Sequence, residues 1–201
     1  MRWRALGALG TLVLATVLSG CRDRWGSELV SVDEAGTDAG NGMSPDGVLS
    51  SDGTKVAFAT LGSDFGPRDT NGNADVYVRD LATGVTTLVS VNGAGTDSSD
   101  HVSSTPVFSP DATKVAFSSH ASNLGPTDTH VGKDVYIRDL STGTTSLVSA
   151  NADGSDSGNL ASEPYAYVNG KVLFSSGASD LGPNDTNGQL DLYLASVVPH
   201  A

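Results

Sequence analysis

The 201-residue chain has a single cysteine, Cys21, so it cannot form an internal disulfide. It also has only one long apolar run, Ala5–Val17, which is too short to span a bilayer comfortably. Arg2 and Arg4 precede this run, and the small residues of "LSGC", which ends at Cys21, close it. A basic start, an apolar centre and a small-residue end are typical of a secretory leader. We therefore expect residues 1–20 to be a signal peptide.

The stretch "LSGC" resembles the lipobox of bacterial lipoproteins, in which the leader is removed just before a cysteine that receives a diacylglyceryl group. The resemblance implies that Cys21 is the lipidation site and that residues 21–27 form a lipid-anchored linker. It places the mature chain at the bacterial cell envelope, on the extracytoplasmic side of a membrane, in the periplasm or at the cell surface. Each buried methylene contributes about 0.8 kcal/mol, so several acyl chains anchor firmly. The alternative is an ordinary cleaved leader with a chance cysteine at its end.

Basic residues are scarce as well, with 11 lysines and arginines against 23 aspartates and glutamates. Loss of the leader removes two arginines and leaves nine basic residues, which gives a formal net charge of −14 over 181 residues. Phosphate binding draws its affinity from clustered lysines and arginines, so we do not expect a nucleic-acid partner. Acidic surface loops attract cations instead.

No stretch of the mature chain shows a helical period, and what the sequence has in place of helices is a repeat. "LVSVDEAGTD" begins at Leu29, "LVSVNGAGTD" at Leu88 and "LVSANADGSD" at Leu147, two steps of 59 residues. Two aromatic positions recur with steps of 59 and 57 residues: Phe58, Phe117, Phe174 and Tyr77, Tyr136, Tyr193. Such a period indicates one supersecondary unit that buries its apolar face only against its neighbours.

Each unit is expected to contain four short antiparallel strands, rich in β-branched and aromatic residues and bounded by turn residues. In the middle copy these strands are 105–109, 114–119, 134–140 and 144–150. The units lie near 28–86, 87–145 and 146–201, within one repeat domain of residues 28–201. Four-stranded antiparallel units in tandem are typical of β-propeller blades, so we predict an all-β fold of three blades.

The repeats also carry a family resemblance. "SSDGTKVAFAT" and "FSPDATKVAFSS", followed by "DVYVRDLATG" and "DVYIRDLSTG", resemble the WD40-like repeat of TolB-type bacterial propellers. The resemblance covers Glu28 to about Ala195 and implies a propeller that binds other molecules, here envelope proteins or glycans. The third copy departs from the pattern at its first turn, because "YVNGKVLFSS" lacks the Pro-Asp pair.

Three blades are few for a ring, since propellers normally have about four to eight. The sequence begins its repeats with a fourth-type strand at Leu29 and its last repeat reaches a third-type strand at Tyr193, so the two ends complement each other. Pairing of these ends between two chains would make a homodimer, a six-bladed ring with two-fold symmetry. A truncated fragment without independent function and an open stack of three blades are the alternatives.

An Asp-rich loop precedes the third strand of each unit. In the first copy, oxygen-bearing side chains occupy alternate positions: Asp69, Asn71, Asn73 and Asp75. The third copy keeps the pattern: Asp185, Asn187, Gln189 and Asp191. The middle copy has His130 and Gly132 between its two aspartates. Alternating oxygen ligands suit Ca²⁺, which we expect in the first and third loops. The alternative is that these side chains cap their own turns without an ion.

Groups for catalysis are not assembled by the sequence. The four histidines do not recur at matching repeat positions, and no pair has metal-ligand spacing: His101, His120, His130 and His200. "GSDSG" has Asp156 where a nucleophile elbow needs serine. We predict no catalytic residue and expect a binding module, with a hydrolase or lyase as the alternative. The connectors that begin at Asn92 and Asn151 would shape one rim of a propeller, which is the candidate binding surface.

Overall fold

The computed structural model describes residues 26–66, 69–125, 128–130, 132–182 and 185–197. Every regular element in these residues is a β-strand, and the strands form three antiparallel sheets. In this part of the chain we find no helix with the length and apolar character that a bilayer crossing requires. The expected leader and Cys21 lie outside the described residues.

Each sheet is one propeller blade, and its strands follow one another in chain order. Blade 1 has four strands: β1 (Asp46–Leu49), β2 (Lys55–Thr60), β3 (Asp75–Asp80) and β4 (Thr86–Leu88). Blade 2 repeats this order: β5 (Ser103–Phe108), β6 (Lys114–Ser119), β7 (Asp134–Asp139) and β8 (Thr144–Leu147). Blade 3 has three strands among the described residues: β9 (Ser162–Val168), β10 (Lys171–Ser176) and β11 (Asp191–Ser196).

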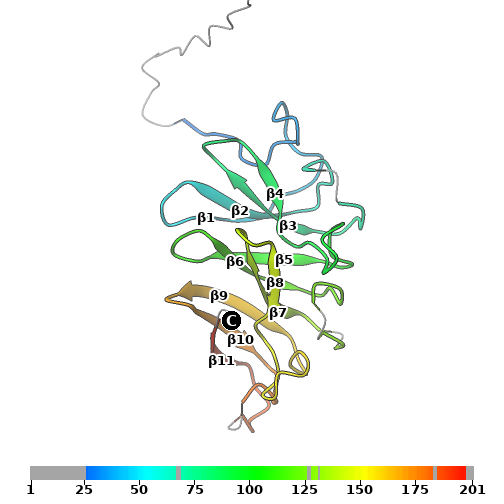
Figure 1. The fold of residues 1–201 in the computed structure, drawn as a ribbon, viewed down its shortest axis with the longest axis vertical. Helices are drawn as coiled ribbons and strands as arrows, with labels where there is room; N and C mark the ends of the chain where they lie inside the picture. Colours follow the sequence, from blue (N-terminus) through cyan, green and yellow to red (C-terminus); the bar gives the residue numbers. More distant parts are fainter. Residues whose placement is uncertain (1–25, 67–68, 126–127, 131, 183–184, 198–201) are drawn as a thin grey trace, which may run out of the picture.

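The three blades are stacked one on another, with blade 1 next to the N-terminal segment and blade 3 at the opposite end (Figure 1). The first strand of blade 2, β5, contacts the first strands of both neighbouring blades, β1 and β9. The fourth strand of each blade connects to the first strand of the next. This arrangement confirms the predicted all-β fold of propeller blades. The predicted strand positions in the middle copy are also confirmed, except that the fourth strand ends at Leu147.

The central strands are buried on both faces because each blade lies against a neighbour. Alternate residues of a strand point to opposite faces, so Ala57 and Phe58 belong to different clusters. Ala57 faces blade 2, where it belongs to the same cluster as Phe117 and Tyr136. Strands buried on both faces read as nearly continuous apolar runs, which explains why "KVAF" shows no polar alternation.

The turn between the first two strands differs in blade 3, as its sequence indicates. In blade 1, Ser50 donates a hydrogen bond to Asp52 at 2.6 Å and accepts one from the Lys55 amide at 2.9 Å. In blade 3, Asn169 and Gly170 join the strands with φ angles of 51° and 72°. Two residues with positive φ form the type I′ turn that suits a tight hairpin. This turn connects the first two strands of blade 3 in place of the Asp-containing turns of blades 1 and 2.

Candidate functional site

The third strand of each blade begins with an aspartate, and in blades 1 and 2 this carboxylate is fully buried. Asp75 accepts hydrogen bonds from the Ser90 hydroxyl at 2.5 Å and from the Asn71 side-chain amide at 2.7 Å. In blade 2, Asp134 accepts a hydrogen bond from Ser149 at 2.8 Å. Each serine–aspartate bond joins the start of the third strand to the segment that follows the fourth strand, so this pair of residues stabilises the outer edge of the blade.

Burial changes the protonation of these two carboxyl groups. The pKa of Asp75 is raised to about 7, mainly by burial and in addition by the nearby carboxylate of Asp69, while the hydrogen bond from Ser90 lowers it. Burial likewise raises the pKa of Asp134 to about 6. One oxygen of Asp134, Oδ2, is buried and has no hydrogen-bond partner among the described residues. Both groups therefore hold protons at a pH where an exposed aspartate is ionised.

A tyrosine–aspartate hydrogen bond occurs in all three blades. The Tyr77 hydroxyl donates to Asp69 at 2.9 Å, and Tyr193 donates in the same way to Asp185. Tyr136 makes the equivalent bond with the first aspartate of its own loop. The bond to Asp185 raises the pKa of Tyr193 to about 12. The first aspartate of the Asp-rich loop thus ties the loop to the third strand.

Three of the predicted calcium ligands, Asn71, Asp75 and Asn187, form hydrogen bonds within their own loops. The side-chain amide of Asn71 donates a hydrogen bond to Asp75, and its Oδ1 accepts one from the Asn73 backbone amide. Both polar atoms of the Asn71 side chain therefore bond within the loop. In the third loop, Asn187 accepts the Gln189 backbone amide at 2.7 Å. The described residues contain no group of three His, Cys, Asp or Glu side chains that could hold a metal ion. Calcium binding at Asp69, Asp75, Asp185 and Asp191 stays a prediction.

The connectors between blades are held by one clamp that occurs three times. A residue of each connector exchanges hydrogen bonds with the loop between the second and third strands of the next blade. The Asp100 backbone amide donates to the Asn123 side chain at 3.0 Å, and the Ser122 amide donates back to Asp100 at 2.9 Å. The pairs Asn41 with Asp64 and Asn159 with Asp180 repeat this contact. These hydrogen bonds hold the connectors in place, and together the connectors form one rim of the stack of blades.

A groove of about 740 Å³ lies beside this rim, between the connector that follows blade 1 and the loops of blade 2. Its lining consists of the connector 92–95, the loop 123–125, the turn 143–145 and Arg138. Glycine and asparagine make up most of the lining residues in the two loops. Arg138 on β7 donates a hydrogen bond to Thr145 on β8 at 2.9 Å. The predicted candidate rim therefore coincides with a polar groove.

Arg138 is a residue of the groove lining that the sequence analysis did not identify. Arg79 occupies the same position one repeat earlier and donates to Thr86 at 2.9 Å. Among the described residues, neither arginine forms an ion pair with a carboxylate. The signal was present in the sequence, because "RDL" recurs at the end of the third strand in a chain with few basic residues. What the sequence did not show is that only Arg138 faces the groove.

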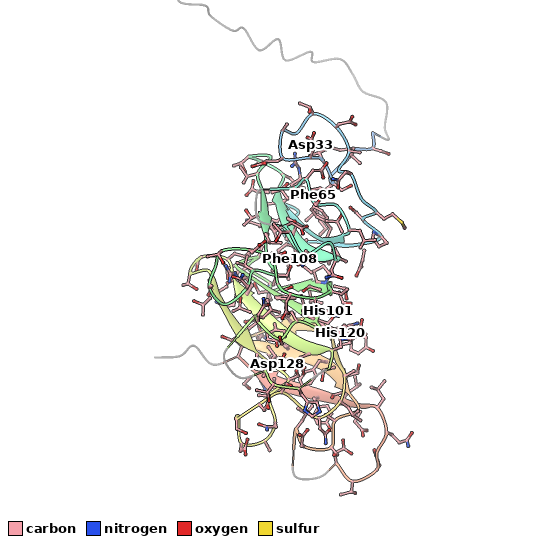
Figure 2. All side chains as sticks on the ribbon, turned by 90° about the vertical axis from the view of Figure 1, so that its right-hand side faces the viewer. Asp33, Phe65, His101, Phe108, His120 and Asp128 are labelled. Atoms are coloured by element: carbon pink, nitrogen blue, oxygen red, sulfur yellow. The ribbon has the colours of Figure 1, made fainter. Side chains whose placement is uncertain are left out.

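Two histidines that lie apart in the sequence come together at one end of the first two strands of blade 2. Figure 2 shows His101 and His120 side by side, and their ring centroids are 5.7 Å apart. The Nδ1 atom of His101 accepts the Val102 amide at 2.9 Å. Burial, together with the charges of His101 and Lys133, lowers the pKa of His120. The register of β5 and β6 brings their ends together, which the spacing of the two histidines does not reveal.

The chain is similar in structure to propellers. TolB from Acinetobacter baumannii matches with a TM-score of 0.40 and 23% identity, over 76% of this chain and 32% of that one. The β-propeller domain of the Trilobed protease from Pyrococcus furiosus matches with a TM-score of 0.45 and 12% identity, over 76% and 40%. The tricorn protease matches with a TM-score of 0.46 and 14% identity, over 75% and 12%.

These similarities concern the fold alone. The chain spans about a third of the TolB structure and a smaller share of the tricorn protease. No protein-family model matches the sequence, and no curated protein matches it either. The class that the coordinates define is an all-β protein of three stacked, antiparallel, propeller-like blades.

Proposed function

We propose that this chain is an exported, lipid-anchored propeller module that binds an envelope protein or a glycan without catalysing a reaction. The observation that carries the proposal is the groove of about 740 Å³ beside the connector 92–95. Binding residues of rigid β scaffolds are found in loops of this kind, because the scaffold fixes them while the loop sequence is free to vary. The hydrogen-bonded clamp at Asp100 and Asn123 supplies that rigidity here.

The chemistry of the groove favours a polar ligand with an acidic group. Arg138 is the one basic side chain in the lining, and it has no carboxylate partner among the described residues. In a chain with an excess of acidic residues, such an arginine is available for a carboxylate or another anion of a ligand. The side chains of Asn92, Asn123 and Thr145 add further polar groups to the lining. An acidic glycan fits this lining better than an apolar peptide.

The non-catalytic part of the proposal is supported by the side chains around the groove. The lining contains no histidine, cysteine or carboxylate that could act as a general base or as a nucleophile. Across the described part of the chain, the hydrogen bonds include no serine hydroxyl paired with a histidine ring. A hydrolase or lyase remains the alternative function, and turnover of a bound glycan would identify it.

The anchor is proposed at Cys21, which lies outside the described residues. Metabolic labelling with an alkyne fatty acid in a bacterial host tests it directly. We expect label on the wild-type chain and recovery in the membrane fraction, and neither for Cys21→Ser. Label on neither chain, with the protein free in the medium, would support a simple cleaved leader instead.

A binding test uses two arginines that differ in their position relative to the groove. Immobilised wild-type chain is screened against an array of acidic and neutral glycans and against envelope extract. We expect Arg138→Gln to weaken capture of the ligand by about tenfold or more, because one charge-assisted hydrogen bond is lost. Arg79→Gln removes the same arginine–threonine bond outside this groove and should leave capture unchanged. Equal effects of both variants, or no ligand at all, would contradict the proposed site.

A further inference from the structure

The outer face of blade 3 is apolar and exposed. Leu192 and Leu194 on β11 are 68% and 59% exposed. Leu173 on β10 lies opposite Leu194 in the sheet register, so the three leucines share one face. Tyr165 on β9 adds a further exposed apolar residue to this blade. Apolar side chains gathered on one face of a sheet mark an interaction surface.

The same face is an interface in the other two blades. The residues that correspond to Leu173, Leu192 and Leu194 are all at most 5% exposed: Ala57, Val76 and Val78 in blade 1, and Ala116, Val135 and Ile137 in blade 2. Those of blade 1 pack against blade 2, and those of blade 2 pack against blade 3. The partner that fits this face in the repeat pattern is therefore another blade.

The opposite end of the stack already holds one strand-like segment of such a blade. Ser27–Leu29 occupies the repeat positions of the paired part of β4 and β8, and Val30–Val32 those of the residues that follow these strands, but the described residues contain no blade before this segment. The bridge between Val32 and Ala39 repeats the bridges that follow β4 and β8. The clamp between Asn41 and Asp64 then fixes this segment against blade 1. It lies where the fourth strand of a preceding blade would lie.

Among the described residues, blade 3 has no counterpart of β4 and β8, which is the strand that Ser27–Leu29 would supply. In blades 1 and 2, the third strand pairs with β4 and with β8. In blade 3, β11 pairs with β10, and its other edge has no partner among the described strands. A free edge carries unpaired backbone donors and acceptors and accepts another strand.

We propose that two copies of this chain close a six-bladed ring, in which β11 of each copy pairs with Ser27–Leu29 of the other copy. The exposed leucine face of blade 3 then packs on the face of blade 1 that carries Phe58 and Tyr77. A ring of six blades lies within the range of about four to eight that propellers normally have. The interface repeats contacts that this chain already makes twice within itself.

The repeat assigns the individual contacts across the interface. Ser90 donates to Asp75 and Ser149 to Asp134, so Ser31 of one copy donates to Asp191 of the other. The carboxylate of Asp191 has no hydrogen-bond partner among the described residues, which leaves it available. Thr70 donates to Asp97, and Thr129 bonds to Asp156 in the same way. By the same correspondence, Thr186 of one copy donates to Asp38 of the other.

The two-fold axis of such a ring coincides with the propeller axis. Equivalent points of the two copies then lie at the same height along the axis. The two N-terminal segments therefore leave the ring on the same side. Two lipid anchors can consequently reach one membrane surface, so the dimer is compatible with the proposed anchoring but does not depend on it.

Disulfide cross-linking between two differently labelled chains tests the register. Val78 lies opposite Thr87 and Ile137 opposite Ser146, which places Leu194 opposite Glu28 of the second copy. Opposite residues of paired strands lie within disulfide distance. All chains carry Cys21→Ser. We expect a covalent dimer when Glu28→Cys and Leu194→Cys chains are mixed and oxidised, and none from either chain alone. Val168→Cys, which is exposed on the far edge of blade 3, should give no link to Glu28→Cys.

The mass of the assembly provides an independent test. Analytical ultracentrifugation of the Cys21→Ser chain at micromolar concentration should give twice the mass of one chain. Leu192→Asp should weaken the dimer by at least about tenfold while the circular dichroism spectrum is unchanged, because this side chain is exposed in the single chain. A single-chain mass at every concentration, a leucine face that binds lipid vesicles instead, or no mixed cross-link would overturn the proposal.

Discussion

The hydroxyl of Ser149 lies 2.8 Å from the carboxylate of Asp134 and donates a hydrogen bond to it. Both residues are fully buried, and the bond joins the start of β7 to the segment after β8. Ser90 and Asp75 make the same contact one blade earlier. Each serine also accepts the backbone amide that follows its aspartate. This serine–aspartate pair stabilises the outer edge of a blade. In blade 3 the aspartate of the pair is Asp191, which we propose bonds to Ser31 of a second copy.

The raised pKa values of Asp75 and Asp134 predict that stability falls as the pH rises. The unfolded chain releases these protons near pH 3.8, whereas the folded chain keeps them to about 7 and about 6. Between those values the folded state binds more protons, so the free energy of unfolding decreases with pH. We expect a higher melting temperature at pH 5 than at pH 7.5. Asp52, which is exposed and has a pKa of about 2, titrates below this window.

The control for the pH effect is the double variant Asp75→Asn and Asp134→Asn. Asparagine has no proton to release, so the melting temperature of this variant should change little between pH 5 and pH 7.5. An equally steep decrease in the variant would assign the pH effect to other groups.

Loss of the serine hydroxyls should destabilise the fold. Ser90→Ala and Ser149→Ala each leave a buried carboxyl group and a backbone amide with one partner fewer. We expect each change to lower the free energy of unfolding by about 1–3 kcal/mol in urea titrations. Ser141→Ala, in an exposed turn, should lie within about 0.5 kcal/mol of the wild type. Equal effects at buried and exposed serines would refute this role.

Close backbone approach at the first clamp makes Gly42 a sensitive position. A Cβ atom at Gly42 would lie 2.3 Å from the Gly62 backbone nitrogen, which cannot move like the end of a side chain. We expect Gly42→Ala to cost about 1–3 kcal/mol and to increase proteolysis of the N-terminal segment. Gly66→Ala meets nothing within 4 Å and is the matched control. A fully stable Gly42→Ala protein would show that this segment is not held against blade 1.

The calcium prediction distinguishes the loops of the three repeats. Millimolar Ca²⁺ should raise the melting temperature of the wild type, since an ion that binds only the folded state stabilises it. The double variant Asp69→Asn and Asp185→Asn should lose this shift. Asp128→Asn should keep it, because His130 and Gly132 interrupt the middle loop. If calorimetry detects no heat and no variant changes the melting temperature, the loops are turns closed by their own side chains.

Part of the site was visible in the sequence. The spacing of the Asp-rich loop and the third strand located Asp69 and Asp75, and the connectors located the rim. The hydrogen-bond partners of the side chains in this loop could not be predicted from the sequence. Asn71 donates a hydrogen bond to Asp75, and the hydroxyl of Tyr77 donates one to Asp69, contacts that the spacing alone does not reveal. The groove beside Arg138 forms only when the fold brings together the connector 92–95, the loop 123–125 and the turn 143–145.

The sequence by itself determined the repeat, the strands and the turns, because these depend on alternation and on turn residues within a few positions of each other. The tertiary structure decided which copies of one pattern are buried. Val76 and Leu192 occupy the same position of the repeat, yet the first is fully buried and the second is 68% exposed. The reason is that burial depends on a neighbouring blade, and residues about 60 positions away supply it for Val76 but none of the described residues supply it for Leu192.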